Sequence, residues 1–408
     1  MADDNLRLKV QHDDVVAQLI ACEEARQRDV IELIPSENYV SNDVLAALGS
    51  AFTNKYSEGY PGKRYYGGQE FTDQVEQLAI DRAKELFHAD HANVQPHSGA
   101  PANEAVYSAW LEPGDTVLAM DLSHGGHLTH GAPVTRSAKL YNFIRYGMKD
   151  IKTGEIDYDQ LRALALEHKP KIIIAGFSAY PGELDYDKFV AIGNEVGALL
   201  MADMAHIAGL IAGGVAENPL DHGFHVMTST THKTLRGPRG GIILSKGIVG
   251  NPLKAPEKII ENIPTLIDRA VFPGMQGGPH MNNIAAKAVA FHEALQPEFK
   301  TYAAQIIKNA QALAGELQKG GLKLISGGTK NHLVLADVYG SFGIDGKEAQ
   351  ERLEAVGIIV NANSIPDDTL PAFRPSGIRL GTPAMTTKGY DEEDFAEVAQ
   401  RILAVLKG

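Results

Sequence analysis

The chain has 408 residues, which is enough for one large domain and a smaller one at roughly 150 residues per domain. Hydrophobic residues make up 44% and charged residues 22% of the chain, so disordered and fibrous classes are excluded. The formal net charge of -13 disfavours non-specific binding to nucleic acid, because that binding depends on neutralising phosphates.

Cys22 is the only cysteine, so neither an intrachain disulfide nor a thiolate metal site can form. The first residues are acidic and lack the basic and apolar regions of a signal peptide. No apolar run approaches the ~20 residues that a membrane span needs. We therefore expect a cytoplasmic protein that binds neither membrane nor nucleic acid.

The first strong periodic pattern predicts a helix over residues 72–87. Its apolar residues recur at helical spacing and share one face. They are Val75, Leu78, Ala79, Ala83, Leu86 and Phe87.

Short apolar runs rich in β-branched residues follow, with helical patterns between several of them. They span residues 116–120, 171–177, 198–203, 225–230 and 241–245. Continuous apolar strands that alternate with helices predict a mostly parallel sheet covered by helices on both faces. Ligands of such sheets bind at the carboxyl ends of the strands, and polar side chains able to do chemistry follow these runs.

After about residue 284 the pattern predicts a smaller α+β domain. Helical patterns over 284–296 and 301–319 precede expected strands at 333–338, 357–360 and 377–380. The final helix carries an apolar face made of Phe395, Val398, Ala399, Ile402 and Leu406. We predict an N-terminal arm over 1–30, a large domain over 31–283 and a small domain over 284–408.

Nucleotide-binding motifs are incomplete in this chain. No G-x-G-x-x-G follows an expected strand. Residues 340–347 look like a P-loop, but the first glycine comes one position early and Glu348 stands where Ser or Thr would bind magnesium. The sequence therefore does not support nucleotide chemistry.

Lys233 follows the run 225–230 and precedes a turn rich in glycine and proline. A lysine at the end of a buried strand loses its proton more easily when it is desolvated and close to other cations, here His232, Arg236 and Arg239. This is what a lysine that forms a Schiff base requires. The alternative is a solvated lysine in a basic turn.

Asp203 ends the apolar run 198–203. A carboxylate at the end of a buried strand is costly unless it meets a cation or strong hydrogen-bond donors. The protonated pyridine nitrogen of pyridoxal phosphate would meet this need. A structural salt bridge with Arg or Lys would meet it equally well.

Ser98 precedes an expected helix that carries Pro101 in its first turn. The free backbone amides at such a helix start can bind an anion, which suits a cofactor phosphate. An ordinary capped helix is the alternative.

Three further segments carry candidate site residues. His124, His127 and His130 could bind zinc, but two glycines argue against a rigid set of ligands. An imidazole stacked on a ring is the better functional interpretation.

The tyrosine- and glycine-rich segment 56–68 is typical of loops that line sites, or of a tyrosine cluster in a solvent loop. Arg379 lies within an apolar strand, where a substrate carboxylate would partner it.

Together these motifs closely resemble the serine hydroxymethyltransferase family. The resemblance runs from Leu33-Ile-Pro-Ser-Glu-Asn38 to residues 377–383, nearly the whole chain. It implies a pyridoxal-phosphate-dependent enzyme of fold type I, with a mostly parallel seven-stranded sheet in the large domain. The implied reaction is reversible transfer of the hydroxymethyl carbon of serine to tetrahydrofolate, which gives glycine and 5,10-methylenetetrahydrofolate. The implied assembly is a homodimer whose subunits share active sites.

The resemblance also implies roles for residues at matching positions. Lys233 would hold pyridoxal 5'-phosphate, Asp203 would pair with its pyridine nitrogen, and His127 would stack on its ring. The other cofactor-binding candidates are Ser98, Gly99, Asn103, Ser178, His206 and His232, with Gly277 and Gly278 from a neighbouring subunit. Thr230 is a further catalytic candidate, and no metal is expected.

The same resemblance implies a substrate site and a folate site. Arg379 would hold the amino-acid carboxylate with help from Ser36 and Tyr66. Tyr56 and Glu58 would reach in from the other subunit, and Glu58 would transfer a proton near the serine hydroxyl. The folate-binding candidates are Leu122, Gly126, Leu128 and Asn363.

Some positions depart from the family's pattern. Ala100 replaces a common serine, and His280-Met-Asn-Asn follows Gly277-Gly-Pro in place of Leu-Met/Glu-His. Residues 251–265 look longer than usual, and Pro371-Ala-Phe373 differs from Ser-Pro-Phe. These departures bear on folate affinity and assembly more than on the core chemistry.

Two other functions are weighed. A folate-independent aldolase acting on threonine-like or α-methylserine substrates would share the cofactor and carboxylate contacts. A catalytically silent homologue is disfavoured because Lys233, Asp203, His127, Glu58 and Arg379 are all present.

Overall fold

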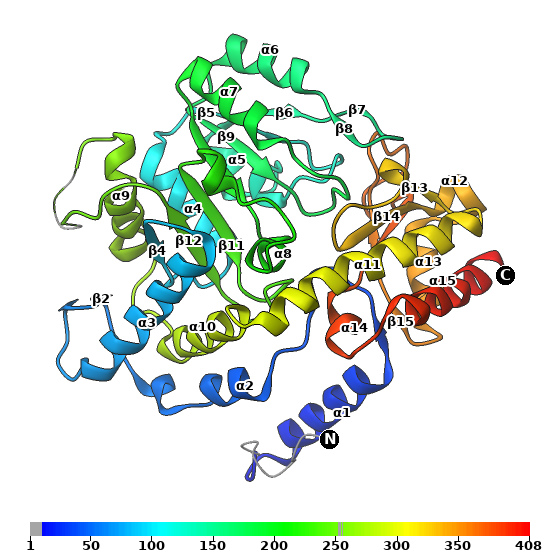
Figure 1. The fold of residues 1–408 in the computed structure, drawn as a ribbon, viewed down its shortest axis with the longest axis horizontal. Helices are drawn as coiled ribbons and strands as arrows, with labels where there is room; N and C mark the ends of the chain where they lie inside the picture. The colour runs from blue at the N-terminus through cyan, green and yellow to red at the C-terminus, as the bar shows by residue number, and fades with distance from the viewer. Residues whose placement is uncertain (1–9, 252–253, 255) are drawn as a thin grey trace.

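The computed structural model describes residues 10–251, 254 and 256–408. Residues 1–9 of the predicted N-terminal arm, and residues 252, 253 and 255 of the segment 251–265, lie outside the described part. Figure 1 shows a large α/β body and, beside it, a smaller group of strands and helices formed by the C-terminal part of the chain. No helix within the described ranges is long and apolar enough to cross a membrane.

The large body is built on a seven-stranded sheet with the strand order β4-β12-β11-β10-β9-β5-β6. β12 runs antiparallel to both of its neighbours, and the adjacent pairs from β11 to β6 are parallel. The strands are β4 (His91–Asn93), β5 (Thr116–Met120), β6 (Asn142–Tyr146), β9 (Ile172–Gly176), β10 (Leu199–Asp203), β11 (Val226–Thr230) and β12 (Gly241–Ser245). The expected mostly parallel seven-stranded sheet is confirmed, and each predicted run contains one strand.

Both faces of this sheet are buried because successive side chains of each strand enter opposite cores. In β10, Leu199 and Met201 enter one core, and Leu200 and Ala202 enter the other. The first face is covered by α4 (Gly99–Trp110) and α9 (Ile263–Arg269). The second face is covered by α3 (Glu70–Phe87), α6 (Tyr158–His168), α7 (Tyr186–Val196), α8 (Ala208–Ala212) and α10 (Met281–Ala294).

The predicted helix over 72–87 is present as α3, but its predicted inner face is wrong at one position. Leu78 is 42% exposed, whereas Glu76 is completely buried. Glu76 accepts a hydrogen bond from the buried guanidinium of Arg64. This ion pair turns a polar position inward, which the apolar spacing could not indicate.

A four-stranded antiparallel sheet with the order β13-β14-β17-β16 forms the centre of the smaller unit. Its strands are β13 (Lys323–Leu324), β14 (Leu333–Asp337), β16 (Asn361–Asn363) and β17 (Gly377–Gly381). The strand expected at 357–360 is β15 (Ile358–Ile359), which pairs with β1 (Ile31–Glu32) instead of joining this sheet. The accompanying helices are α12 (Val338–Phe342), α13 (Gly346–Glu354), α14 (Pro383–Thr387) and α15 (Glu392–Lys407).

Helix α11 (Pro297–Lys319) connects the two units. Its first half, with Phe299 and Ile306, packs in the core of the large sheet, and its second half, with Leu313 and Leu317, packs in the core of the small sheet. The two cores therefore meet along one continuous helix. The domain bounds expected from the sequence stay a prediction.

The remaining elements lie at the periphery. α1 (Asp14–Asp29) has no buried residue, and α2 (Asn42–Leu48) packs against α10. α5 (Arg136–Leu140) precedes β6, and β7 (Met148–Asp150) pairs with β8 (Glu155–Ile156). The hairpin of β2 (Gly59–Tyr60) and β3 (Lys63–Arg64) precedes α3.

The two leucines of α3 test the corrected helix face. Leu86 is 8% exposed and Leu78 is 42% exposed. Leu86→Ala should lower the free energy of unfolding by about 2–5 kcal/mol, since it leaves a cavity in the core. Leu78→Ala should cost about 0.5 kcal/mol. Denaturant unfolding of the cofactor-free protein measures both, and equal losses would contradict this placement.

Candidate active site

A cavity of about 310 Å³ lies where β9, β10 and β11 end, a volume at the lower end of the usual range for small-molecule sites. The predicted residues that line it are Ser36, Ser98, Gly99, Asn103, His127, Ser178, Asp203, His206, Thr230, His232, Lys233 and Arg379. Ala100, Phe177, Ala205 and Arg239 line it as well. A larger cavity of about 600 Å³ beside α7 and α8 contains none of the predicted site residues and shares only Phe177 with the first.

Lys233 stands on a tight turn just after β11. The turn is closed by bonds from the Arg236 amide to the Lys233 carbonyl and from the Gly237 amide to the Thr231 carbonyl. Arg236 adopts a left-handed conformation there, with φ of 57°. The Lys233 residue is 8% exposed, and its Nζ makes no hydrogen bond to a described residue. Its amine is therefore available to react.

The charge state of Lys233 suits a nucleophile. Burial lowers the pKa of its amine from 10.5 to about 8, because an ammonium group is poorly solvated there. The Asp203 carboxylate opposes this shift, and the guanidinium groups of Arg379 and Arg239 add to it. A substantial fraction of the amine is therefore neutral near physiological pH, as imine formation needs.

Asp203 is a buried carboxylate with dedicated donors. Its Oδ2 accepts hydrogen bonds from Asn103 Nδ2 at 2.8 Å and from His130 Nε2 at 3.0 Å. Although burial alone would raise the pKa of Asp203, the His130 ring and the Asn103 amide hold it well below its usual range. The carboxylate therefore remains charged and can face a ring cation in the cavity.

The hydrogen bonds around Asp203 also indicate which ring nitrogen of each neighbouring histidine carries the proton. The amide of His127 donates to His130 Nδ1, so His130 carries its proton on Nε2 and donates it to Asp203. The amide of Thr129 donates to His127 Nδ1, which leaves the His127 proton on Nε2. Burial lowers the pKa of His127 to about 4, so this ring is neutral and suited to stacking. The sequence analysis named His130 only as a possible zinc ligand and did not name Thr129.

Ser98 and His232, which also line the cavity, suit an anion. Ser98 caps the start of α4, as the sequence predicted, but its hydroxyl makes no capping bond. Nδ1 of His232 is buried and makes no hydrogen bond to any described residue. A phosphate here would accept bonds from the helix-start amides and the free Ser98 hydroxyl, and from His232 Nδ1 in the tautomer that carries the ring proton on that nitrogen. Ala100 also lines the cavity and contributes no hydroxyl.

Arg379 reaches the cavity from β17 of the small sheet. Its Nη1 donates to the carbonyl of Ser178 at 2.6 Å and to the Ser178 hydroxyl at 3.2 Å, and its Nε donates to Asn361. Burial lowers the pKa of its guanidinium to about 10. Nη2 makes no hydrogen bond among the described residues, so a substrate carboxylate can complete the coordination of this cation.

His206 is held by a second histidine that the sequence analysis missed. His206 Nδ1 lies 3.2 Å from Nε2 of His332, and the two rings are stacked with centroids 5.4 Å apart. His206 Nε2 lies 3.5 Å from the Ser178 hydroxyl. Burial, with the nearby charges of Lys233 and Arg379, lowers the pKa of His206 well below 6.5.

The residues expected to serve a neighbouring subunit form a separate cluster, which also holds Tyr66, a residue expected to help Arg379 bind the substrate carboxylate. The Tyr56 and Tyr66 hydroxyls donate to the two carboxylate oxygens of Glu58 at 3.3 and 3.1 Å. A Cβ on Gly277 would lie 3.2 Å from Glu58 Oε1, and one on Gly278 would lie 3.4 Å from the Tyr56 ring. None of these residues lines the cavity of their own chain.

The folate-binding candidates also lie outside the cavity lining. Leu122 and Leu128 are 47% and 50% exposed. Gly126 packs against the backbone of Met120, where a Cβ would come within 2.3 Å of the carbonyl oxygen. Asn363 donates to the carbonyl of Ser364. Their role stays a prediction.

The candidate zinc ligands of the sequence do not converge as a set of three histidines. His124 Nδ1 accepts the Met148 amide, whereas His127, His130 and Asp203 have ligand atoms within 4.8 Å of one another. His130 already donates to Asp203 in this group, which explains the proximity without an ion. The expectation of no metal stays a prediction.

The sheet and the cavity define the class of protein. A free amine, a charged carboxylate with its own donors, a neutral imidazole and an anion cradle surround one cavity, and these residues fit pyridoxal phosphate. With the seven-stranded sheet, they define a pyridoxal-phosphate-dependent enzyme of fold type I.

Comparison with known proteins specifies the family. Residues 9–402 match the family described as serine hydroxymethyltransferase. A serine hydroxymethyltransferase of Xanthomonas campestris pv. campestris (strain B100) is 57% identical over 97% of this chain and 91% of its own length. One of Xanthomonas axonopodis pv. citri (strain 306) is 56% identical over the same shares. The chain belongs to the serine hydroxymethyltransferase family.

The lowered pKa of Lys233 predicts the pH dependence of cofactor capture. The rate at which the cofactor-free protein develops visible absorption with pyridoxal phosphate should follow a group with a pKa of about 8, since only the neutral amine attacks. Arg239→Gln removes a neighbouring cation and should move the midpoint to higher pH. Lys233→Ala should give no such band. A wild-type midpoint near 10.5 would contradict the assignment.

The bond from His130 to Asp203 predicts a loss of stability. His130→Leu leaves the buried carboxylate with fewer donors and should cost about 1.5–3 kcal/mol in the cofactor-free protein. The exposed pair of His88 and Asp221, at 3.0 Å, supplies a matched control, and His88→Leu should cost far less. Denaturant unfolding of both variants makes the comparison, and equal costs would contradict this role for His130.

Proposed function

We propose that this protein catalyses reversible transfer of the hydroxymethyl carbon of serine to tetrahydrofolate, giving glycine and 5,10-methylenetetrahydrofolate. The observation that carries the proposal is the placement of the unpaired Lys233 amine in one cavity with Asp203, His127 and Arg379. The relatives named serine hydroxymethyltransferase support the same reaction.

The contacts described above support a cofactor site. Lys233 would hold pyridoxal 5'-phosphate covalently, Asp203 would pair with the pyridine nitrogen, and His127 would stack on the ring. Ser98, Gly99 and His232 would bind the phosphate, and Ser178 and His206 would lie near the phenolic oxygen. When bound, the cofactor supplies an electron sink for bonds to the α-carbon of the amino acid. Asn103 and Thr230 complete the walls of the site.

The substrate is oriented by charge. Arg379 binds the carboxylate of serine with its unpaired nitrogen, and Ser36, which lines the same cavity, assists it. This contact holds the side chain of serine towards the group that moves its proton. Glu58 of the partner subunit takes the proton of the serine hydroxyl, and Tyr56 and Tyr66 hold its carboxylate by hydrogen bonds.

A homodimer with shared sites is supported by the cluster of Tyr56, Glu58, Tyr66, Gly277 and Gly278. These residues lie together and away from the cavity of their own chain. Two copies related by a twofold axis would each lend this cluster to the other.

Tetrahydrofolate is the co-substrate. Leu122 and Leu128 offer exposed apolar surface for its ring system. Gly126 and Asn363 are the other two residues proposed to bind it. Holding donor and acceptor in one site supplies effective concentration. The protein acts in the cytoplasm, and with its net charge of -13 it needs neither a membrane nor nucleic acid as a partner.

Absorption spectra of the protein loaded with pyridoxal phosphate test this function. Glycine and tetrahydrofolate together should produce a strong band at longer wavelength, because folate binding promotes loss of a proton from glycine. Glycine alone should produce little of it. Serine cleavage should depend on tetrahydrofolate.

Arg379→Lys keeps the positive charge but loses the planar guanidinium, which can bind a carboxylate through two hydrogen bonds. The KM for serine should therefore rise about tenfold to a hundredfold, equivalent to about 1.5–3 kcal/mol.

The outcomes separate the candidate reactions. Cleavage of serine without any response to folate would replace the transferase with the folate-independent aldolase. Absence of a visible band after pyridoxal phosphate is added would refute the enzyme assignment at Lys233.

A further inference from the structure

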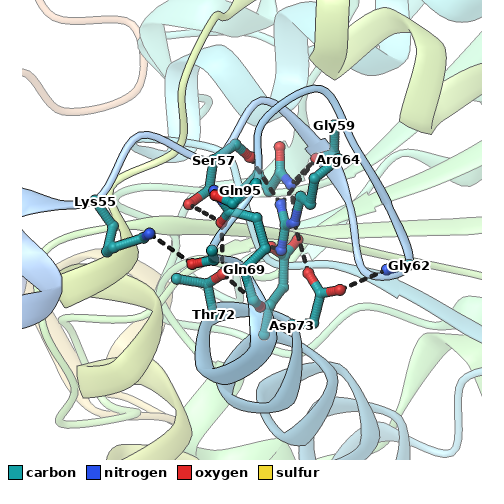
Figure 2. A network of polar contacts seen from close by, with 12 residues as sticks. Lys55, Ser57, Gly59, Gly62, Arg64, Gln69, Thr72, Asp73 and Gln95 are labelled. Atoms are coloured by element: carbon teal, nitrogen blue, oxygen red, sulfur yellow. Dashed lines mark hydrogen bonds and ion pairs between the residues drawn. The ribbon is translucent and has the colours of Figure 1, made fainter.

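The segment 55–68 is an irregular loop with a short hairpin, and it carries Tyr56, Glu58 and Tyr66 on its surface. Figure 2 shows the polar side chains that lie beneath it, which come from the hairpin itself, from the start of α3 and from Gln95. Among them, Gln69, Arg64 and Gln95 bond to the backbone of the loop, and none bonds to the side chain of Glu58.

Gln69, which immediately precedes α3, binds the loop at both of its ends. Its Nε2 donates to the carbonyls of Tyr56 at 3.0 Å and Gly67 at 3.2 Å. Its Oε1 accepts the hydroxyls of Ser57 at 2.8 Å and Thr72 at 2.6 Å. Every hydrogen-bonding atom of this amide group is therefore engaged, and the residue is only 8% exposed.

Arg64 binds the loop on both sides of Glu58. Its Nη1 donates to the carbonyls of Ser57 at 2.8 Å and Gly59 at 3.0 Å. Its remaining nitrogens contact Asp73 at 2.8 Å and Glu76 at 2.5 Å, and its side chain is 3% exposed. The guanidinium thus anchors the residues on either side of Glu58 to α3 through their carbonyl groups.

Two further contacts leave the backbone at Glu58 little freedom. The carbonyl of Glu58 accepts the amide of Tyr65, and the carbonyl of Gly59 also accepts Gln95 Nε2 at 2.9 Å. Gly59 has φ of 99°, and a Cβ there would lie 2.3 Å from the Lys63 carbonyl oxygen. The turn after Glu58 is therefore restricted to glycine.

The arrangement contrasts a backbone held by buried polar side chains with a carboxylate side chain that is only half-buried. The only side chains that hydrogen-bond to the Glu58 carboxylate within the described residues are Tyr56 and Tyr66. A buried ion pair such as Arg64 with Glu76 is weak evidence for stability, because desolvation offsets its attraction. What such a network supplies reliably is a single geometry for the groups it binds.

We propose that Gln69 and Arg64 are positioning residues that hold the backbone around Glu58, so that each chain presents its carboxylate in the geometry required by the active site of the partner subunit. This inference rests on the proposed function, in which Glu58 acts across the dimer. It assigns the role to residues that lie outside both the cavity and the Glu58 cluster.

Hydrogen exchange and activity test this role together. Gln69→Met keeps the length of the side chain and removes all four bonds of the amide group. Amides of residues 55–68 should exchange faster in the cofactor-free variant, and turnover of serine should fall about tenfold to a hundredfold, since small displacements of a catalytic group are costly. Gln77→Met, at an exposed position of the same helix where the amide contacts only Asp81, should change neither.

Mixed dimers then show whether the effect acts through Glu58. A chain with Gln69→Met is paired with a chain carrying Lys233→Ala, and the heterodimer is purified with two different tags. One site of this dimer combines the intact Lys233 of the first chain with the intact Glu58 loop of the second. That site should turn over serine at the wild-type rate per site. A second heterodimer, which pairs a Glu58→Gln chain with a Lys233→Ala chain, should behave in the same way.

The results distinguish failure of this inference from failure of the proposed function. The positioning role would be overturned if the heterodimer with Glu58→Gln recovers serine turnover and the heterodimer with Gln69→Met does not. Gln69 would then support the cavity of its own chain. Unchanged hydrogen exchange in Gln69→Met would overturn it as well. If Glu58→Gln retains full activity or fails to recover in the mixed dimer, the shared-site part of the proposed function is the part that fails.

Discussion

The carboxylate of Asp203 ends the central strand β10 in a place where a charge is costly, and the surrounding elements are arranged to stabilise it. Asn103 comes from α4 and His130 from the loop after β5, and both donate to Oδ2. Their own positions depend on further bonds, from Thr228 to Asn103 and from Asn103 to Thr129. A buried polar network of this kind is stable only when its members are satisfied, so it imposes one arrangement on the floor of the cavity.

The cations above this floor have the opposite property. Lys233 and Arg379 are buried without full partners, and each lowers the pKa of groups around it. A ligand that brings a phosphate and a carboxylate would complete these positive groups. Because Arg379 comes from the small sheet and bonds to Ser178 after β9, the substrate end of the site depends on the contact between the two cores. Helix α11 packs in both cores and so connects them directly.

The residues around Glu58 are proposed to act in the site of the partner subunit rather than in the cavity of their own chain. The cluster around Glu58 rests on a loop whose backbone is bonded to Gln69, Arg64 and Gln95 (Figure 2). The buried Arg64 and Glu76 are the reason that the inner face of α3 is not wholly apolar. The difference between the predicted and observed faces of that helix, at Leu78 and Glu76, is thus tied to the support of a functional loop.

The sequence by itself determined the strands of the large sheet, because continuous apolar runs can be buried only in a sheet covered on both faces. It also determined the chemistry at their ends, since Lys233 and Asp203 follow those runs directly. Only the tertiary structure decided which groups support them. His130 lies 73 positions from Asp203, and His332 lies 126 positions from His206. Local patterns carry no information about such pairs, because hydrogen bonds between distant segments form only when packing brings those segments together.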